Sequence, residues 1–208
     1  MTLYLLIAVV AGYLLGALPF GYLVARAKGV NIFEVGSRNP GATNVRRVLG
    51  AGAGTAVLIL DALKGSAAAG WPLVLRSVPK AEVLAIAGLV AAILGHSFSC
   101  FTGFRGGKSV ATAAGGFAVL FPAGMGIAAI AFAATLALSR YVSLSSMMGA
   151  ATLPIAAVAL GRSAALIGVA VAIALFVIVR HHTNITRLLA GTESKIGRPS
   201  AAPPAAPR

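Results

Sequence analysis

A glycine-rich basic segment, residues 103–112, has the residue types best suited to binding an anion. It reads Gly103-Phe104-Arg105-Gly106-Gly107-Lys108-Ser109-Val110-Ala111-Thr112. Gly106 and Gly107 allow the backbone to approach a phosphate closely, and Lys108 supplies a positive charge. The segment is not a P-loop, because the first glycine of that motif would fall at Thr102. The sequence therefore predicts a phosphate-contacting turn; the alternative is a flexible turn between two helices.

A second polar segment combines a tight turn with hydroxyl, amide and guanidinium groups. It reads Gly36-Ser37-Arg38-Asn39-Pro40-Gly41-Ala42-Thr43-Asn44-Val45-Arg46-Arg47. Pro40-Gly41 favours a turn, and Thr43 and Asn44 are residue types that favour the N-cap of a helix. Free N–H groups at a helix start could surround an anion together with Arg47. The alternative is a solvated loop whose arginines only set the membrane topology.

Two further polar segments lie towards the C-terminus. Arg140-Tyr141-Val142-Ser143-Leu144-Ser145-Ser146 carries hydroxyl groups into an apolar run, where such groups often only bond the preceding helical turn. The other runs from Arg180 to Glu193. Within it, His181 and Asn184 are three apart and share one helix face, whereas His182 faces elsewhere. A single His is more often structural than catalytic, but His and Asn together beside basic segments favour a function.

Several classes of enzyme lack their characteristic residues. The sequence has no HExxH motif, no acidic cluster for a metal and no GxSxG motif. With four acidic residues in total, paired-carboxylate chemistry is not expected. We therefore expect no metal and no cofactor. The remaining polar groups suit a phosphate-bearing substrate and a lipidic partner.

The elements that position these segments are helices in a membrane. Of the 208 residues, 59% are hydrophobic and 10% charged, whereas a soluble domain carries about 25% charged residues. The mean hydropathy is +0.94. The net charge of +13 could indicate nucleic-acid binding, but cytoplasmic loops of membrane proteins also collect Lys and Arg. We favour topology and anionic ligands as its cause, and expect no nucleic-acid partner.

Apolar runs predict an all-α, polytopic membrane protein. The uncharged stretch 109–139 would measure about 46 Å as one helix, which is long for one span and short for two. Pro122 near its middle disfavours a continuous helix. Two spans there put 13 Lys and Arg residues on one side of the membrane and 3 on the other, whereas one span gives 8 and 8. The positive-inside rule selects seven spans: 3–25, 52–75, 82–101, 109–121, 123–139, 143–160 and 163–179.

This topology places the N-terminus outside and the C-terminus in the cytoplasm. All four polar loops, 29–47, 102–109, 140–146 and 180–197, then lie on the cytoplasmic side. Asp61 and Lys64, three apart within a span, should pair or face a cavity. We expect one membrane-embedded domain over 1–197 and a disordered tail over 198–208, which is rich in Pro and Ala.

Taken together, the polar segments resemble the bacterial acyl-phosphate:glycerol-3-phosphate acyltransferases, the PlsY family. Three motifs carry the resemblance, in order and over nearly the whole chain to about residue 197: Gly36 to Arg47, Gly103 to Thr112, and His181 to Glu193. Modest departures are Arg38 where the family often has a small residue, Arg105 for a common Lys, and Ser109 for a common Gly.

The resemblance implies the reaction and the residues that carry it. An acyl chain would move from acyl phosphate to the 1-hydroxyl of sn-glycerol 3-phosphate, giving lysophosphatidic acid and phosphate, at the cytoplasmic face of the bacterial inner membrane. We expect a monomer. The residues matching the family's catalytic positions are His181, Asn184, Lys108 and Ser37. Those matching its substrate-binding positions are Asn39, Gly41, Thr43, Asn44, Arg47, Gly106, Gly107, Ser143 and Glu193, with Ser145 a less secure alternative to Ser143.

The proton acceptor stays open, because either His181 or the substrate's own phosphate could take the hydroxyl proton. Two other functions compete with acyl transfer. A transporter of a phosphorylated small molecule predicts binding groups near the membrane midplane and internal repeats, and no clear repeat is present. A purely structural membrane protein would not need three clustered polar motifs.

Overall fold

The protein is entirely helical over the part of the chain that its structure, a computed structural model, describes: residues 1–75 and 79–197. The expected tail 198–208 lies outside these residues. The helices are α1 Thr2–Ala17, α2 Phe20–Arg26, α3 Ala42–Leu49, α4 Ala51–Val74, α5 Ala81–Ser97, α6 Val110–Leu120, α7 Pro122–Ser139, α8 Val142–Ala159, α9 Ala164–Arg180 and α10 His182–Leu189, with a short 3₁₀ turn at Cys100–Thr102. Each predicted apolar run has become helix.

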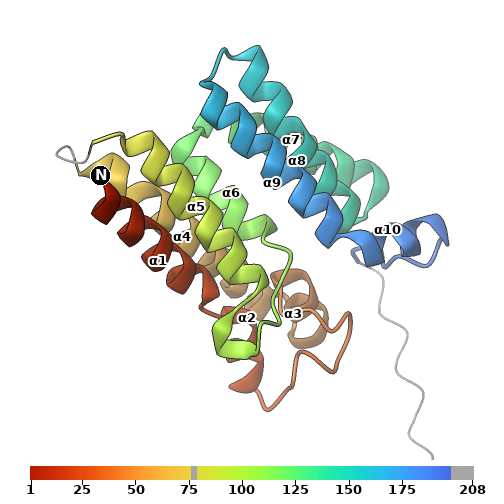
Figure 1. The fold of residues 1–208 in the computed structure, drawn as a ribbon. Coiled ribbons are helices and arrows are strands. Elements are labelled where there is room, and N and C mark those ends of the chain that lie inside the picture. Colours follow the sequence, from red (N-terminus) through yellow and green to blue (C-terminus); the bar gives the residue numbers. More distant parts are fainter. Residues whose placement is uncertain (76–78, 198–208) are drawn as a thin grey trace, which may run out of the picture.

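Two prolines divide apolar runs. The helix of the run expected as one span over 3–25 is interrupted at Leu18-Pro19, between α1 and α2, because proline has no N–H to continue the helical hydrogen bonds. The two pieces together still form one candidate span, Thr2–Arg26. The division predicted around Pro122 is confirmed. Pro122 is the first residue of α7, a position where the missing N–H costs nothing, and the chain turns back between α6 and α7 (Figure 1).

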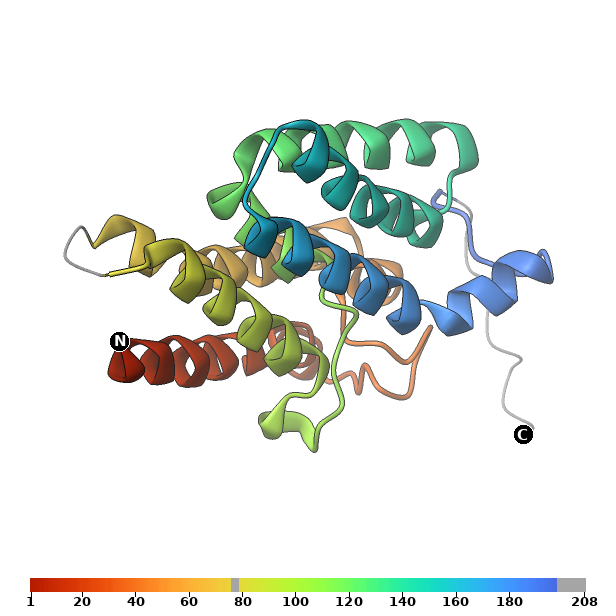
Figure 2. The same cartoon turned by 45° about the horizontal axis from the view of Figure 1, so that its top comes forward.

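The helices pack as two groups that share a core. In the first, α1 lies against α5, and α4 lies against α5 and α6; in the second, α8 packs between α7 and α9 (Figure 2). Buried apolar residues of α5, α6, α8 and α9 form one continuous cluster that joins the two groups. Phe117 and Leu89 lie fully buried within it. The shared core fixes the ends of α5 and α9, which carry the polar segments.

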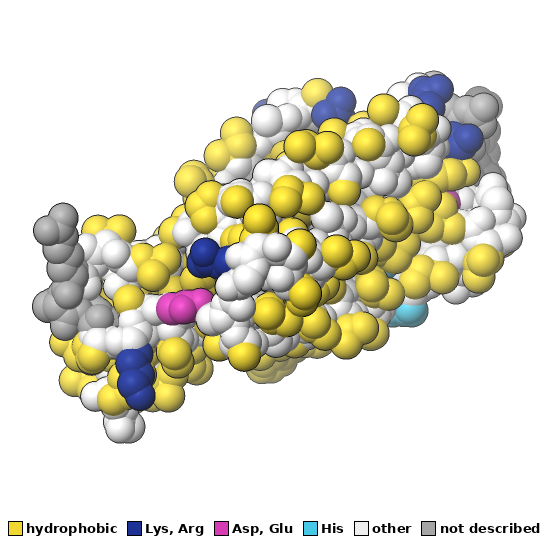
Figure 3. Space-filling view, turned by 90° about the horizontal axis from the view of Figure 1, so that it is seen from above, with side chains coloured by type: hydrophobic (Ala, Val, Ile, Leu, Met, Phe, Trp, Pro, Cys, Tyr) yellow, Lys and Arg dark blue, Asp and Glu magenta, His cyan; other side chains and the backbone are white. Residues whose placement is uncertain are grey.

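Apolar side chains also cover the outside of the molecule. Leu138 is 89% exposed and Ile130 71% exposed, and hydrophobic side chains dominate the face seen in Figure 3. Among the described residues, five helices are long and apolar enough to span a membrane, or six if the bent pair α9 and α10 counts as one span. The 11-residue α6 measures about 16 Å, roughly half the hydrocarbon thickness.

The polar segments gather at one end of the molecule. Figure 1 shows α2, α3 and α10 at the end of the helical body remote from the N-terminus, together with the loop between α5 and α6. The opposite end holds the turn between α8 and α9, where the Ser163 hydroxyl donates a hydrogen bond to Glu82 at 2.7 Å. Segments that are far apart in the sequence therefore share one surface.

Candidate active site

A hydrogen-bonded network joins three of the four polar segments. Lys108 donates to the Asn184 side-chain oxygen, and the Asn184 amide donates to Glu193 Oε1 at 2.6 Å. The same Oε1 accepts a hydrogen bond from the Ser143 hydroxyl at 2.7 Å. Arg187 Nε donates to Glu193 Oε2 at 2.7 Å. Lys108, Asn184, Ser143 and Glu193, all predicted from the sequence, thus meet in one place.

His181 lies at the break between α9 and α10, which meet at 58°. Its Nδ1 contacts the Val177 carbonyl oxygen at 2.7 Å. Since a carbonyl can only accept, Nδ1 carries a proton and a neutral ring leaves Nε2 as an acceptor. Burial, the largest cause, lowers the pKa of His181 to about 4, so the imidazole is neutral at pH 7. It can therefore accept a proton or a hydrogen bond from a substrate hydroxyl.

Lys108 lies at the positive centre of the site. Burial lowers the pKa of its ammonium to about 8, and the charges of Arg187, Arg180 and Arg47 act in the same direction, against Glu193. A lysine so surrounded gains from the arrival of an anion, which offsets the repulsion among the cations. The cluster therefore has the electrostatic character of a phosphate site.

Glu193 is the one acidic group in this network. Burial would raise the pKa of its carboxyl, but hydrogen bonds from Arg187, Ser143 and Asn184 outweigh burial and lower it. The carboxylate is thus ionised at neutral pH. A charged acceptor with three donors fixes the direction of each donor more firmly than a neutral one would.

The first polar segment folds around Asn44. Its Oδ1 accepts a hydrogen bond from the Ser37 backbone N–H at 2.8 Å, its amide donates to the Val35 carbonyl at 3.1 Å, and Arg47 lies 3.5 Å from the same Oδ1. The N-cap prediction for Thr43 and Asn44 is wrong. The N-cap is Gly41, and Asn44 is in the first turn, where its side chain reaches back to the loop.

Asn39 organises the turn before α3. Its side-chain oxygen accepts a hydrogen bond from the Gly41 N–H at 2.9 Å, which is a local Asx turn. The chain before this turn contacts the glycine-rich loop, because the Arg105 guanidinium lies 4.4 Å from the centre of the Phe33 ring. Ser37 and Thr43 are exposed. Among the described contacts, neither side chain bonds to the Lys108 network, so the structure brings this segment beside the network and not into it.

Two arginines of the site were not among the predicted site residues. Arg180 donates to the Gly107 carbonyl at 2.9 Å, and Arg187 binds Glu193. From the sequence, Arg180 was expected only as one of the charges that set the topology, although its position next to His181 was a usable signal. The structure also distinguishes the two serine alternatives. Ser145 donates to the Tyr141 carbonyl of its own helix at 2.8 Å, whereas Ser143 reaches Glu193.

The fold and the network define an integral membrane protein of the α-helical, polytopic class, with a polar, cation-rich site at one end. A family model, described as glycerol-3-phosphate acyltransferase, matches residues 6–191. Curated proteins of the same description include one from Fusobacterium nucleatum, 46% identical over 190 residues and covering 90% of this chain and 95% of that protein. One from Geobacter sulfurreducens is 43% identical over 190 residues and covers 91% and 96%.

Solved structures of the same family have a fold similar to that of this chain. The crystal structure of PlsY (YgiH), an integral membrane glycerol 3-phosphate acyltransferase, in its glycerol 3-phosphate form superposes with a TM-score of 0.87 at 35% identity, covering 93% of this chain and 96% of that one. Its lysophosphatidic acid form gives a TM-score of 0.84. The chain belongs to the PlsY glycerol-3-phosphate acyltransferase family, as the three motifs predicted.

Proposed function

We propose that this enzyme transfers an acyl chain from acyl phosphate to the 1-hydroxyl of sn-glycerol 3-phosphate. The hydroxyl oxygen attacks the acyl carbon, the bond from that carbon to the phosphate oxygen breaks, and the products are lysophosphatidic acid and inorganic phosphate. The related PlsY structures are of a glycerol 3-phosphate form and a lysophosphatidic acid form. These are the acceptor and the product of the proposed reaction.

The observation that carries the proposal is the contact of Lys108 with Asn184 beside Glu193 and the buried His181. Both substrates bear phosphate, and the reaction develops negative charge on the carbonyl oxygen and on the leaving phosphate. Lys108 and Arg47, with backbone N–H groups of the glycine-rich loop other than that of Gly107, would hold the phosphates and stabilise this charge. The first segment, Ser37, Asn39, Gly41, Thr43 and Asn44, would complete the substrate pocket.

His181 and Asn184 would orient the glycerol hydroxyl against the acyl carbon. Positioning of this kind can contribute about 7–11 kcal/mol to a reaction between two molecules. His181 Nε2 is available to accept the hydroxyl proton, although a pKa of about 4 makes the free imidazole a weak base. Two bound phosphates would raise that pKa, and a substrate phosphate oxygen is itself a competent acceptor. Catalysis by this route needs no metal and no cofactor.

The placement in the membrane forms part of the same proposal. We propose that residues 1–197 form one domain that crosses the membrane seven times, with α6 as a short crossing, the N-terminus outside and the active site at the cytoplasmic face of the bacterial inner membrane. Support comes from Arg47, Lys108 and Arg180 at the polar end, whereas Arg162 lies near the opposite end in the turn between α8 and α9. The protein would act as a monomer and bind no nucleic acid.

A transporter of a phosphorylated molecule is less well supported. It would need binding groups near the membrane midplane, between repeated halves. The network joining Lys108 to Glu193 instead uses helix ends and loops at one end of the molecule, where a lipid-borne acyl chain and a soluble acceptor can meet.

The test is phosphate release from acyl phosphate by purified protein, with and without glycerol 3-phosphate. Lys108→Ala and His181→Ala should each leave the protein folded and lower the rate of acyl transfer at least about 100-fold, the scale of losing one charge-stabilising or proton-handling group. Wild-type rates for both variants would overturn the assignment of the site.

A further inference from the structure

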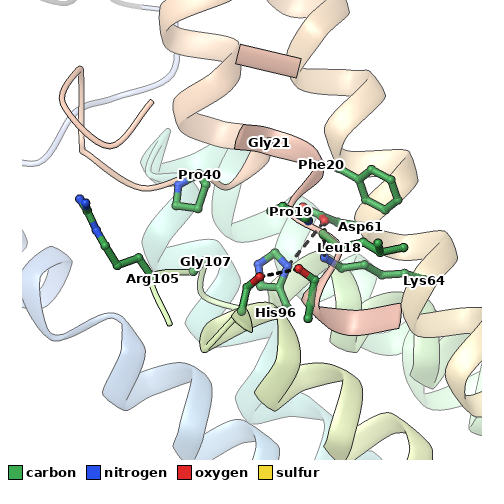
Figure 4. A pocket seen from close by; sticks show the side chains of 13 residues that line it. Leu18, Pro19, Phe20, Gly21, Pro40, Asp61, Lys64, His96, Arg105 and Gly107 are labelled. Carbon is green, nitrogen blue, oxygen red and sulfur yellow. Dashed lines mark hydrogen bonds and ion pairs between the residues drawn. The ribbon is translucent and has the colours of Figure 1, made fainter. Parts of the chain in front are cut away.

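A buried ionic cluster lies beneath the glycine-rich loop, on α4 and α5. Asp61 Oδ1 is 2.8 Å from Lys64 Nζ and 3.5 Å from His96 Nδ1. Lys64 also donates to the Leu18 carbonyl at 2.9 Å, at the break between α1 and α2. The three side chains lie together beside the turn that carries Gly107 (Figure 4), and the exposed fractions of Asp61, Lys64 and His96 are 3%, 3% and 9%. Asp61 and Lys64 were expected either to pair or to face a cavity, and they pair; the participation of His96 was not predicted.

The glycine-rich loop rests directly on His96. The Gly107 N–H donates to the His96 carbonyl at 3.1 Å. A Cβ atom at position 107 would lie 2.1 Å from His96 Nε2, and one at position 106 would lie 2.1 Å from the His96 carbonyl oxygen. Glycine at positions 106 and 107 therefore lets the loop pack against His96, in addition to letting the backbone approach a phosphate.

The residues on both sides of Lys108 are anchored by the same end of α5. The Gly107 carbonyl accepts from the Ser97 hydroxyl at 3.2 Å. The Ser109 hydroxyl lies 2.7 Å from Ser97 Oγ and donates to the Ile93 carbonyl at 2.8 Å. Lys108 thus extends from a backbone held at its preceding and following residues, and its ammonium reaches Asn184. A shift of the loop would move that ammonium directly.

A buried ion pair is poor evidence for stability, because the desolvation cost of the two charges can exceed their attraction. Buried charged groups can instead hold the surrounding structure in a single conformation. We propose that Asp61, Lys64 and His96 form a positioning unit, which holds the Gly106-Gly107 turn and thereby sets the position of the Lys108 ammonium for acyl transfer. This rests on the function proposed above. His96 acts through Lys108 and does not itself touch substrate.

A double-mutant cycle between His96 and Lys108 tests the coupling. His96→Ala alone should lower kcat about 10- to 100-fold, the scale of a misplacement of about 1 Å, with the KM values changed less than about twofold. In the Lys108→Ala background the same substitution should change the rate less than about twofold, because residues that act as one unit are not additive. An unchanged kcat, or equal losses in the two backgrounds, would overturn the proposal.

A second variant covers the case in which His96→Ala fails to fold. Asp61→Asn with Lys64→Met removes both buried charges together and leaves no lone ion. It should fold and still lose at least about tenfold in kcat, with faster amide hydrogen exchange over residues 103–109 and unchanged exchange over α4 and α5. Ser66→Ala is the matched control, because it removes a single α4 hydrogen bond to the Gly115 carbonyl; its activity should stay at the wild-type level.

The outcomes separate the two proposals. If the wild type does not release phosphate from acyl phosphate, the proposed function fails. If the wild type is active and Lys108→Ala is inactive, but the Asp61→Asn/Lys64→Met variant is folded and fully active with unchanged exchange over 103–109, only the positioning unit is wrong.

Discussion

The Glu193 carboxylate joins Ser143, Asn184 and Arg187 in the proposed active site, so Glu193→Gln should impair acyl transfer while keeping the size of the side chain. Glu193 accepts hydrogen bonds from Ser143, Asn184 and Arg187 at 2.6–2.7 Å. A glutamine amide keeps one acceptor oxygen and turns an NH₂ group towards the other donors. At least one charge-assisted bond is lost, which costs about 1.5–3 kcal/mol and corresponds to about a 10- to 150-fold lower kcat/KM.

The assay is phosphate release from acyl phosphate in the presence of glycerol 3-phosphate, together with a thermal melting curve. Glu82→Gln is the matched control, because Glu82 also accepts a serine hydroxyl at 2.7 Å but lies at the opposite end of the molecule. It should change kcat/KM less than about twofold. A Glu193→Gln variant that is folded and as active as the wild type would show that the carboxylate does not orient Asn184.

Three further expectations concern pH, the serines and the topology. Lys108 is charged below its pKa of about 8, so kcat/KM should fall as the pH rises through about 8. Bound phosphate stabilises the ammonium, so the corresponding fall in kcat should occur at higher pH. A kcat/KM that does not change with pH in this range would contradict the role of the ammonium. Ser143→Ala should lower acyl transfer at least about tenfold, since a hydrogen bond to a charged group is worth about 1.5–3 kcal/mol, whereas Ser145→Ala should have less than about a twofold effect. In a Cys100→Ser background, an Arg162→Cys variant should react with an impermeant thiol reagent added to intact cells, whereas a Thr43→Cys variant should react only in inverted membrane vesicles. Labelling of both cysteines from the same side would contradict the seven-span topology.

Much of the fold was predictable because the information is local. A run of apolar residues long enough to cross hydrocarbon predicts a helix, and Pro122 divided such a run as expected. Pro19 offered the same signal, but its run was short enough to remain one span, so the break between α1 and α2 was missed. The N-cap assignment of Asn44 failed because a distant loop, at Ser37 and Val35, competes for its side chain.

Several members of the hydrogen-bonded network were predictable from the sequence, but their contacts with one another were not. Motif residues such as Lys108, Asn184 and Glu193 stand out as polar groups in an apolar chain. Which of them touch depends on how α9 and α10 bend at His181 and on where the loop before α6 lies, and both follow from tertiary packing. The contact between His96 and Asp61 is the clearest example, because nothing in the sequence around His96 indicates that Asp61 lies beside it.

The most direct test of the central claim compares acyl donors for the purified wild-type protein. Acyl phosphate and acyl-CoA of the same chain length would each be supplied with glycerol 3-phosphate, and lysophosphatidic acid would be measured. A site built from Lys108, Arg47 and the Gly106-Gly107 turn to bind a phosphate leaving group predicts product, with an equal amount of inorganic phosphate, from acyl phosphate alone. Equal or faster transfer from acyl-CoA would contradict it.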